Sequence, residues 1–203
     1  GEPLLRDSVL ANQGLLILLP HLGNWELFNV FYRRYGNMTA LYHPPRLSYL
    51  DNIMQGIRER HGNEMVPTDL RGIRRLYRSL ESSGTAVILP DQVPVSGRFA
   101  PFFGTAALTD ELVIRLQKKT AARVLMLAFL RRSDGKFDIH ITCARKELYG
   151  DDSISALTAL NSMVETSISL EPSQYQWEYK RFKKRPKGEK KVYRLNKPAG
   201  VHN

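Results

Sequence analysis

The residues best suited to chemistry are His21 and Glu26, five positions apart at the end of an apolar stretch. A histidine that a carboxylate orients can take a proton from a hydroxyl group near neutral pH, which contributes about 10² to 10⁴ in rate. The spacing alone is weak support, because 20 acids among 203 residues often place one there by chance. The position of the pair in the predicted fold is more informative.

Two residues five apart on one helix point about 140° away from each other, so the pair meets only if His21 precedes the helix. Residues 14–20 (GLLILLP) predict a buried strand, Gly23 permits a tight turn and Asn24 is a favoured N-cap. Glu26 then falls in the first helical turn, where the macrodipole favours a carboxylate. We therefore expect Glu26 to orient His21. The alternative is a structural histidine beside a surface glutamate.

The remaining pattern alternates between short apolar runs and amphipathic stretches, with a predicted loop at residues 90–107, which hold three prolines and two glycines. This alternation predicts a single α/β domain with a mostly parallel mixed sheet flanked by helices. The expected strands are 14–20, 38–42, 64–67, 85–89, 123–131 and 137–145, and the expected helices follow Asn24 and cover 49–60, 70–80, 109–119 and 154–169.

Composition fits one globular domain, since 203 residues with 42% hydrophobic content can bury a core. No apolar run approaches the roughly 18 residues that cross a bilayer. The single cysteine, Cys143, excludes an internal disulfide and agrees with a reducing compartment. Cys143 shares its predicted strand face with Ile139 and Ile141, so we expect it in the core and not as a nucleophile.

The positive charge is concentrated near the C-terminus. Residues 180–197 hold ten Lys or Arg against one acid, Glu189, and the rest of the chain is almost balanced. Such a local patch suits an anionic lipid, a phosphate or an acidic partner better than a whole nucleic-acid-binding face. The alternative is a solvated tail.

Four segments together resemble the bacterial lipid A late acyltransferases, a branch of the lysophospholipid acyltransferase superfamily. Residues 21–26 (HLGNWE) match the H-x4-D/E motif of that family. Three further stretches match in the same order, namely residues 90–94 (PDQVP), 101–107 (PFFGTAA) and 172–186 (PSQYQWEYKRFKKRP). The resemblance spans roughly residues 10 to 186.

The resemblance implies a glycerolipid-acyltransferase-like fold and transfer of a fatty acyl chain from acyl carrier protein or coenzyme A to a hydroxyl of a lipid A precursor or related lipid. His21 would be the general base and Glu26 its partner, with no acyl-enzyme, no metal and no bound cofactor. It also implies work on the membrane surface, at the cytoplasmic face of the bacterial inner membrane. We expect residues 1–186 to form this domain without the family's N-terminal membrane segment, followed by a basic tail at 187–203.

Further site residues follow from the resemblance or from placement. A functional arginine of the family corresponds to Arg58 or Arg60, of which we assign Arg58 to hold a phosphate or the thioester oxygen. Its alternative is a solvated helix end. Asn24 and Arg181 lie in the matched segments and are carried over as substrate-binding residues.

Asp91 and Gln92 follow a buried strand, so they reach the edge of the sheet that holds His21 if both strands are parallel, and we expect them in the acceptor pocket. Phe102 and Phe103 either line the acyl channel or anchor the loop to the core.

Near the C-terminus, Trp177 and Tyr179 either meet lipid headgroups or dock on the core. Two other functions remain open. A non-catalytic lipid-binding or membrane-surface module would bind vesicles without depending on His21, and a nucleic-acid binder would need a signature that this sequence lacks.

Overall fold

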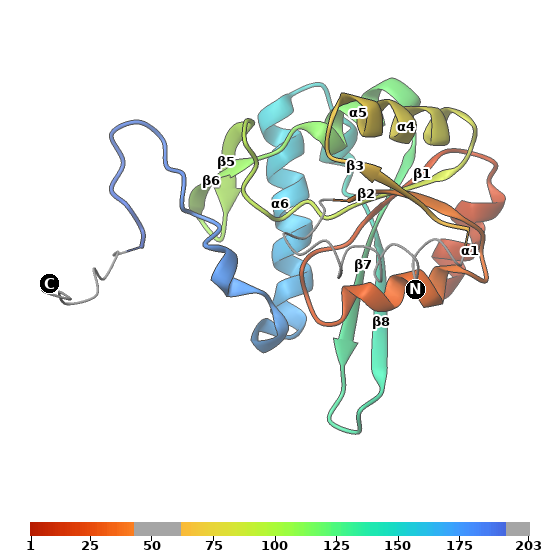
Figure 1. Ribbon diagram of the computed structural model, residues 1–203. Coiled ribbons are helices and arrows are strands. Elements are labelled where there is room, and N and C mark those ends of the chain that lie inside the picture. Colours follow the sequence, from red (N-terminus) through yellow and green to blue (C-terminus); the bar gives the residue numbers. More distant parts are fainter. Residues whose placement is uncertain (43–61, 194–203) are drawn as a thin grey trace, which may run out of the picture.

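A twisted six-stranded sheet lies at the centre of the molecule and has helices on both faces, while a two-stranded hairpin packs at one side (Figure 1). This computed structural model describes residues 1–42 and 62–193. The fold is the expected α/β class with a mostly parallel mixed sheet. The expected helix at 49–60, with Arg58 and Arg60, lies outside the described residues.

The strands of the described residues are β1 (Leu15–Leu18), β2 (Met38–Tyr42), β3 (Glu64–Pro67), β4 (Thr85–Ile88), β5 (Arg98–Phe102), β6 (Thr105–Thr109), β7 (Arg123–Arg131) and β8 (Phe137–Cys143). The α-helices are α1 (Glu2–Leu10), α2 (Phe28–Tyr32), α4 (Leu70–Glu81), α5 (Leu112–Thr120) and α6 (Ser153–Leu170). Four 3₁₀ turns complete this part of the chain: η1 (Trp25–Leu27), η2 (Lys146–Tyr149), η3 (Pro172–Gln174) and η4 (Trp177–Tyr179).

The strand order is β3-β2-β4-β1-β7-β8, and only the β7–β8 pair is antiparallel. The two central strands, β1 and β4, are buried along their whole length, as continuous apolar runs predict. The expected hairpin through residues 133–135 joins β7 to β8. Because β1 and β4 run parallel, the residues that follow them emerge at the same edge of the sheet.

Two apolar layers cover the sheet. On one face α4, α5 and α6 pack with Leu76, Leu116 and Leu160 in the core, and on the other face α1 and α2 contribute Leu5 and Phe28. Both layers line the cavity described below, with Phe28 from the second face and Leu112 and Val113 from the first. No helix in the described part of the chain is long and apolar enough to cross a membrane.

Three expectations about the fold are wrong. Residues 98–109 form the β5–β6 hairpin instead of a loop, because the two strands pair only with each other and Pro101 therefore removes no bond from the central sheet. Helix α1 was not expected. Cys143 is exposed, since it ends the outermost strand of the sheet, whereas Ile141 on the same face is buried.

Candidate active site

His21 and Asp91 lie just beyond the carboxyl ends of two neighbouring parallel strands, at equivalent positions. The pairing of β1 with β4 sets Leu18 opposite Ile88, and each of the two polar residues follows three positions later. The carboxyl ends of parallel strands are where open α/β sheets hold ligands. The register alone thus brings a histidine and a carboxylate together across 70 residues of sequence.

The carboxylate of Asp91 contacts His21 at two points. Its Oδ2 accepts a hydrogen bond from the His21 backbone N–H at 2.9 Å, and its Oδ1 lies 2.8 Å from ring Nδ1. An ionised carboxylate only accepts, so Nδ1 carries the proton and Nε2 keeps its lone pair. In agreement with this tautomer, the side-chain amide of Gln92 lies 2.9 Å from Nε2 and donates to it. Asp91 is 3% exposed, and His21 is also buried.

The expected orientation of the imidazole by Glu26 stays a prediction. Both ring nitrogens of His21 are engaged, by Asp91 and Gln92. Glu26 lies in the 3₁₀ turn η1, where its Oε2 accepts from the side chain of Asn29 at 3.2 Å. The ring faces the exit of β4, because that strand is the direct neighbour of β1 in the sheet. Glu26 nevertheless lines the same cavity as His21.

Gly23 makes the turn after His21, as expected. Its φ of +61° is in the left-handed region, and a Cβ there would lie 1.9 Å from the backbone oxygen of Phe129. The turn is tied to β7, since the N–H of Asn24 donates to that same oxygen at 2.9 Å. Asn24 does not cap the following turn with its side chain, so this part of the expectation is wrong.

Two aromatic rings hold the imidazole from its sides. The ring of Trp25 meets His21 edge-on with centroids 5.6 Å apart, and the ring of Tyr179 lies at 5.2 Å. Tyr179 reaches the site from η4, near the far end of the described chain. Of the two C-terminal aromatic residues considered from the sequence, Tyr179 packs on the site, whereas Trp177 is half exposed.

A cavity of about 680 Å³ opens beside His21. It crosses the sheet from the end of β1 to β3, and most of its lining is apolar. Its polar groups, besides His21 and two tyrosines, are Glu26, Asn29, Thr68, Gln92 and Asp110. The apolar lining from the strands consists of Leu19, Met38, Ala40, Leu41, Met65, Val87, Ile88 and Leu89. A histidine base at the edge of such a cavity can act on a substrate that carries an apolar chain.

Several predicted binding residues lie elsewhere. Asp91 contacts the cavity only through His21, so its expected place in the pocket lining is wrong, whereas Gln92 does line the pocket. Phe102 is buried in the core beside α6, which favours the anchoring alternative over the acyl channel. Phe103 is exposed at the tip of the β5–β6 hairpin, also away from the cavity. The positions of these residues depend on tertiary packing, which the local sequence pattern does not show.

Asn24 and Arg181 also lie outside the cavity in which a substrate was expected. Asn24 borders a shallow surface depression near β7, together with Gly23 and Gln174. Arg181 is buried, and its guanidinium donates to the backbone oxygen of Leu108 and, at 2.9 Å, to the Thr109 hydroxyl. Neither residue is among the described residues that line the cavity. A buried arginine that donates to protein groups is not free to bind a substrate.

One contact of the site was missed entirely. Tyr175 lies with its hydroxyl beside the Asp91 carboxylate, and burial, together with this carboxylate, raises the pKa of the phenol. Tyr175 belongs to segment 172–186, which matches the family, and this match was the only sign in the sequence analysis that the residue could belong to the site. Its function could not be read from that segment without the position of Asp91.

The fold and the site define an α/β protein with a buried histidine–aspartate pair at the edge of an apolar cavity. The family model for bacterial lipid A biosynthesis acyltransferase matches residues 1–184. The chain therefore belongs to the bacterial lipid A biosynthesis acyltransferase family, as its sequence motifs indicated.

Characterised relatives agree with this membership. The chain is 28% identical over 195 residues to the lipid A biosynthesis palmitoleoyltransferase of Escherichia coli (strain K12). The matched region covers 93% of this chain and 62% of that protein. The chain is 27% identical over 200 residues to the myristoyltransferase of the same organism, covering 96% and 61%. The lauroyltransferase is 25% identical over 195 residues, covering 93% and 62%. The chain thus spans less than two thirds of the length of these relatives.

Proposed function

We propose that this protein transfers a fatty acyl chain from an acyl thioester to a hydroxyl of a lipid A precursor or a related lipid. The observation that carries the proposal is His21 at the edge of an apolar cavity, with its Nδ1 on the Asp91 carboxylate and its Nε2 turned to the Gln92 amide. Membership of the family supports the reaction class, and the names of the relatives differ in the acyl group they specify. The donor is acyl carrier protein or coenzyme A.

In the proposed reaction, the acceptor hydroxyl takes the place that the Gln92 amide occupies at Nε2. Nε2 removes the hydroxyl proton while the oxygen attacks the thioester carbonyl. The tetrahedral intermediate then expels the thiolate, which takes the proton back from the imidazolium. Asp91 holds the ring in the required tautomer through Nδ1 and stabilises the imidazolium while it exists. The ester oxygen comes from the acceptor, and no acyl-enzyme forms.

We propose that the acyl chain lies in the cavity across the sheet. The lining side chains come from β1, β4, β2 and β3 in spatial order, and three strand spacings correspond to about 14 Å. An apolar chain of this length gains free energy by leaving water, at about 0.8 kcal/mol for each methylene buried. Glu26, which lines the cavity near His21, is proposed to accept a hydrogen bond from the acceptor.

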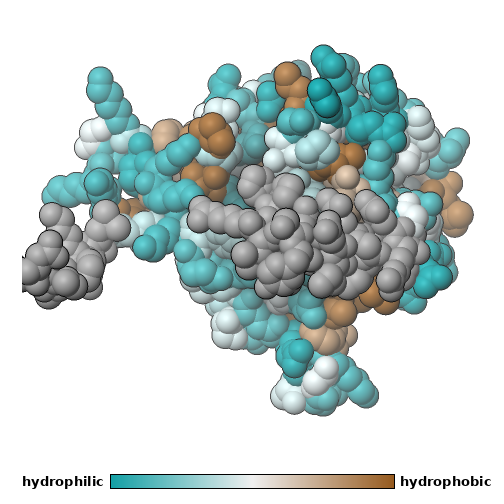
Figure 2. Space-filling model, in the orientation of Figure 1, coloured by the Kyte–Doolittle hydropathy of each residue, from teal (hydrophilic) through white to brown (hydrophobic). Residues whose placement is uncertain are grey.

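We propose that the β5–β6 hairpin and η4 form a membrane-facing patch, defined by Phe103, Trp177 and Lys180. Phe103 is 44% exposed and Trp177 is 50% exposed, and their ring centroids lie 6.2 Å apart. Figure 2 shows a surface that is mostly hydrophilic, with hydrophobic residues in small groups. Aromatic rings next to an exposed lysine suit the boundary between acyl chains and anionic headgroups.

The backbone of Phe103 supports a function for the patch. The paired residues Phe102 and Thr105 leave a two-residue turn, in which Phe103 has a φ of +47° and Gly104 a φ of +70°. A bulky residue rarely adopts this conformation, which costs about 1 to 2 kcal/mol. The Glu165 side chain stabilises the turn by accepting from the Phe103 N–H at 2.8 Å. A bulky residue kept in this conformation at the surface motivates the proposed function.

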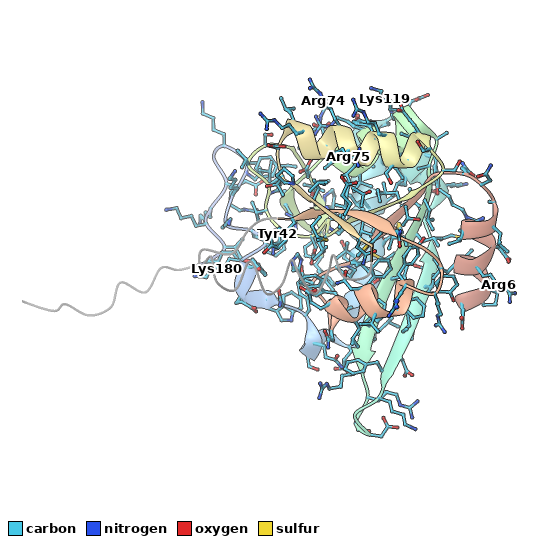
Figure 3. The ribbon with its side chains drawn as sticks, turned by 45° about the vertical axis from the view of Figure 1, so that its right-hand side comes forward. Arg6, Tyr42, Arg74, Arg75, Lys119 and Lys180 are labelled. Carbon is cyan, nitrogen blue, oxygen red and sulfur yellow. The ribbon has the colours of Figure 1, made fainter. Side chains whose placement is uncertain are left out.

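The patch is distinct from the other cationic part of the surface. Figure 3 shows Arg74 and Arg75 on α4 and Lys119 on α5 at one end of the molecule, well away from Lys180. We propose the cytoplasmic face of the inner membrane as the place of action, on the basis of the resemblance and of the single cysteine. The basic tail at 187–203 would add attraction for anionic lipid.

The test is ester formation by the purified protein from a labelled acyl thioester and a lipid A precursor. We expect transfer, and His21→Ala should lower kcat more than tenfold. His140→Ala is the matched control, because His140 is exposed on β8 and away from the cavity. Equal rates for the two variants would contradict the proposal. Binding of vesicles without ester formation would instead indicate a non-catalytic lipid-binding module.

A further inference from the structure

We propose that Tyr175 is a positioning residue that fixes the Asp91 carboxylate beside His21, and that the buried Arg181 cancels part of the field that this carboxylate exerts on the imidazole. This inference rests on the proposed role of His21 as the base. Both residues come from the C-terminal segment 174–181, which follows α6 and lies 150 or more residues after His21 in the sequence.

The segment is bonded directly to the backbone around His21. The N–H of Gln176 donates to the His21 carbonyl oxygen at 3.1 Å, and the N–H of Gly23 donates to the Gln174 oxygen at 3.0 Å. Between these bonds, Leu22 and Tyr175 form an antiparallel bridge. The C-terminal segment therefore forms part of the site, and any shift of it would move His21.

Tyr175 contacts the Asp91 carboxylate from the C-terminal segment. The phenol is buried, and its hydroxyl faces the carboxylate, whose two oxygens already accept from His21. Burial first, and then the neighbouring negative charge, raise the pKa of Tyr175 above its ordinary value of 10.0. The group is a neutral phenol, whose hydrogen can only lower the charge density of the carboxylate that it faces.

Arg181 supplies a full positive charge behind this pair. It is 4% exposed, and its guanidinium donates to neutral acceptors on Leu108, Thr109 and Asn161. No carboxylate of the described residues forms an ion pair with it, and its Nε has no hydrogen-bond partner among them. Burial lowers the pKa of Arg181, and the negative charge of the Asp91 carboxylate opposes this lowering.

A buried cation without a direct ion pair needs a nearby negative charge, because desolvating it alone costs several kcal/mol. Asp91 is the carboxylate that acts on Arg181, so the guanidinium and the imidazole lie in the field of the same anion. Without Arg181, the Asp91 charge would act on His21 alone and stabilise the imidazolium, which cannot serve as a base. The arginine thus favours the neutral ring that the reaction requires.

Other ionisable groups face this network and must stay unchanged in any test. Glu26 and Asp110 line the cavity on the far side of His21, and the Tyr179 ring packs on the imidazole. The hydroxyl of Tyr193 acts on both Arg181 and Tyr175 and accepts from the N–H of Phe182 at 3.2 Å. None of these groups is altered in the variants below.

The experiment follows the titration of the His21 ring by NMR, assigned through its loss in His21→Gln. We expect Arg181→Met to move the midpoint to higher pH by about half a unit or more, because a charge that opposed the imidazolium is gone. Tyr175→Phe should move it in the same direction by less. Arg181→Lys keeps the charge and should stay close to the parent protein.

Tyr32→Phe is the matched control, since it also removes a buried hydroxyl, bonded at 2.6 Å to Thr85, without approaching Asp91. If Arg181→Met does not fold, the nearly isosteric Tyr175→Phe still decides the question. Midpoints for Arg181→Met and Tyr175→Phe that match the Tyr32→Phe value, or that move to lower pH, would overturn the inference. Because the titration needs no substrate, its result is separate from the outcome of the transfer assay.

The rate gives a second readout where transfer is measured. Tyr175→Phe should reduce kcat at neutral pH by up to about threefold, the most that a midpoint shift of half a unit can cause, with little change in KM and with recovery at higher pH. A purely structural role would instead lower activity by the same factor at every pH.

Discussion

Asp91 holds His21 by both its backbone and its ring, with one carboxylate oxygen on each. The two bonds fix the imidazole in position and in tautomer at once, which a single contact from a flexible side chain would not do. The pair is buried, so water does not compete for these bonds. We therefore propose Asp91 as the residue that orients the His21 ring.

Replacing Asp91 with Asn should lower kcat by about 10² to 10⁴ while the fold persists, because the ring loses its charged acceptor and the preferred tautomer. Steady-state kinetics with a saturating thioester measures the effect. Asp138→Asn is the matched control, because Asp138 is an exposed residue of β8. Retention of more than a tenth of the parental kcat in Asp91→Asn would refute the assignment.

Gly23→Ala should destabilise the protein by about 2 kcal/mol or more, because the added Cβ would meet the backbone oxygen of Phe129 in a left-handed turn. Gly135→Ala serves as the control. Gly135 also has a positive φ, but nothing lies within 4 Å of its Cβ position. Urea denaturation should show a loss of about 1 kcal/mol for the control. Equal losses would mean that close approach at Gly23 is unimportant.

Ala40→Leu should shorten the acyl chains that the protein accepts. Ala40 is a buried residue of β2 that lines the cavity, so added methyl groups occupy space proposed for the chain. We expect kcat/KM for the longest thioesters to fall by about tenfold or more, relative to short ones, at roughly 0.8 kcal/mol for each methylene displaced. A uniform loss across chain lengths would place the acyl group elsewhere.

Membrane binding should depend on the exposed aromatic residues. The double variant Phe103→Ser, Trp177→Ser should bind vesicles with anionic lipid at least about tenfold more weakly, since each large apolar side chain contributes about 1.5 to 3 kcal/mol when buried. Vesicle sedimentation measures the change. Leu10→Ser on α1 removes a similarly exposed apolar residue as a control. An effect of the control as large as that of the double variant would rule out a localised patch.

Stability should decrease at high pH through buried phenols. The pKa of Tyr175 is raised in the folded state by burial, so the unfolded chain ionises first as the pH passes 10.0. This contribution is complete below that pH and is lost as the pH rises toward the folded pKa. Tyr175→Phe should therefore lose less stability between about pH 8 and pH 11 than the parent protein, as measured by urea denaturation. An equal loss in both proteins would contradict the prediction.

Much of the fold could be predicted from local pattern. Apolar runs identified the buried strands β1 and β4, the periodicity of residues 70–80 identified α4, and the Gly23 turn after His21 was recognised from residue types. These features depend on burial and backbone freedom within a few residues, which the sequence shows directly. The hairpin β5–β6 was missed because Pro101 and the glycines read as a loop.

The sequence by itself determined that a histidine follows a buried strand, that the chain is α/β, and that its motifs are those of the lipid A acyltransferases. Only the tertiary structure decided which groups surround that histidine. The register of β1 against β4 selects Asp91, and the return of the C-terminal segment adds Tyr175 and Arg181. Pairing between distant segments depends on the free energy of the whole packed chain, so no periodicity near His21 could reveal it.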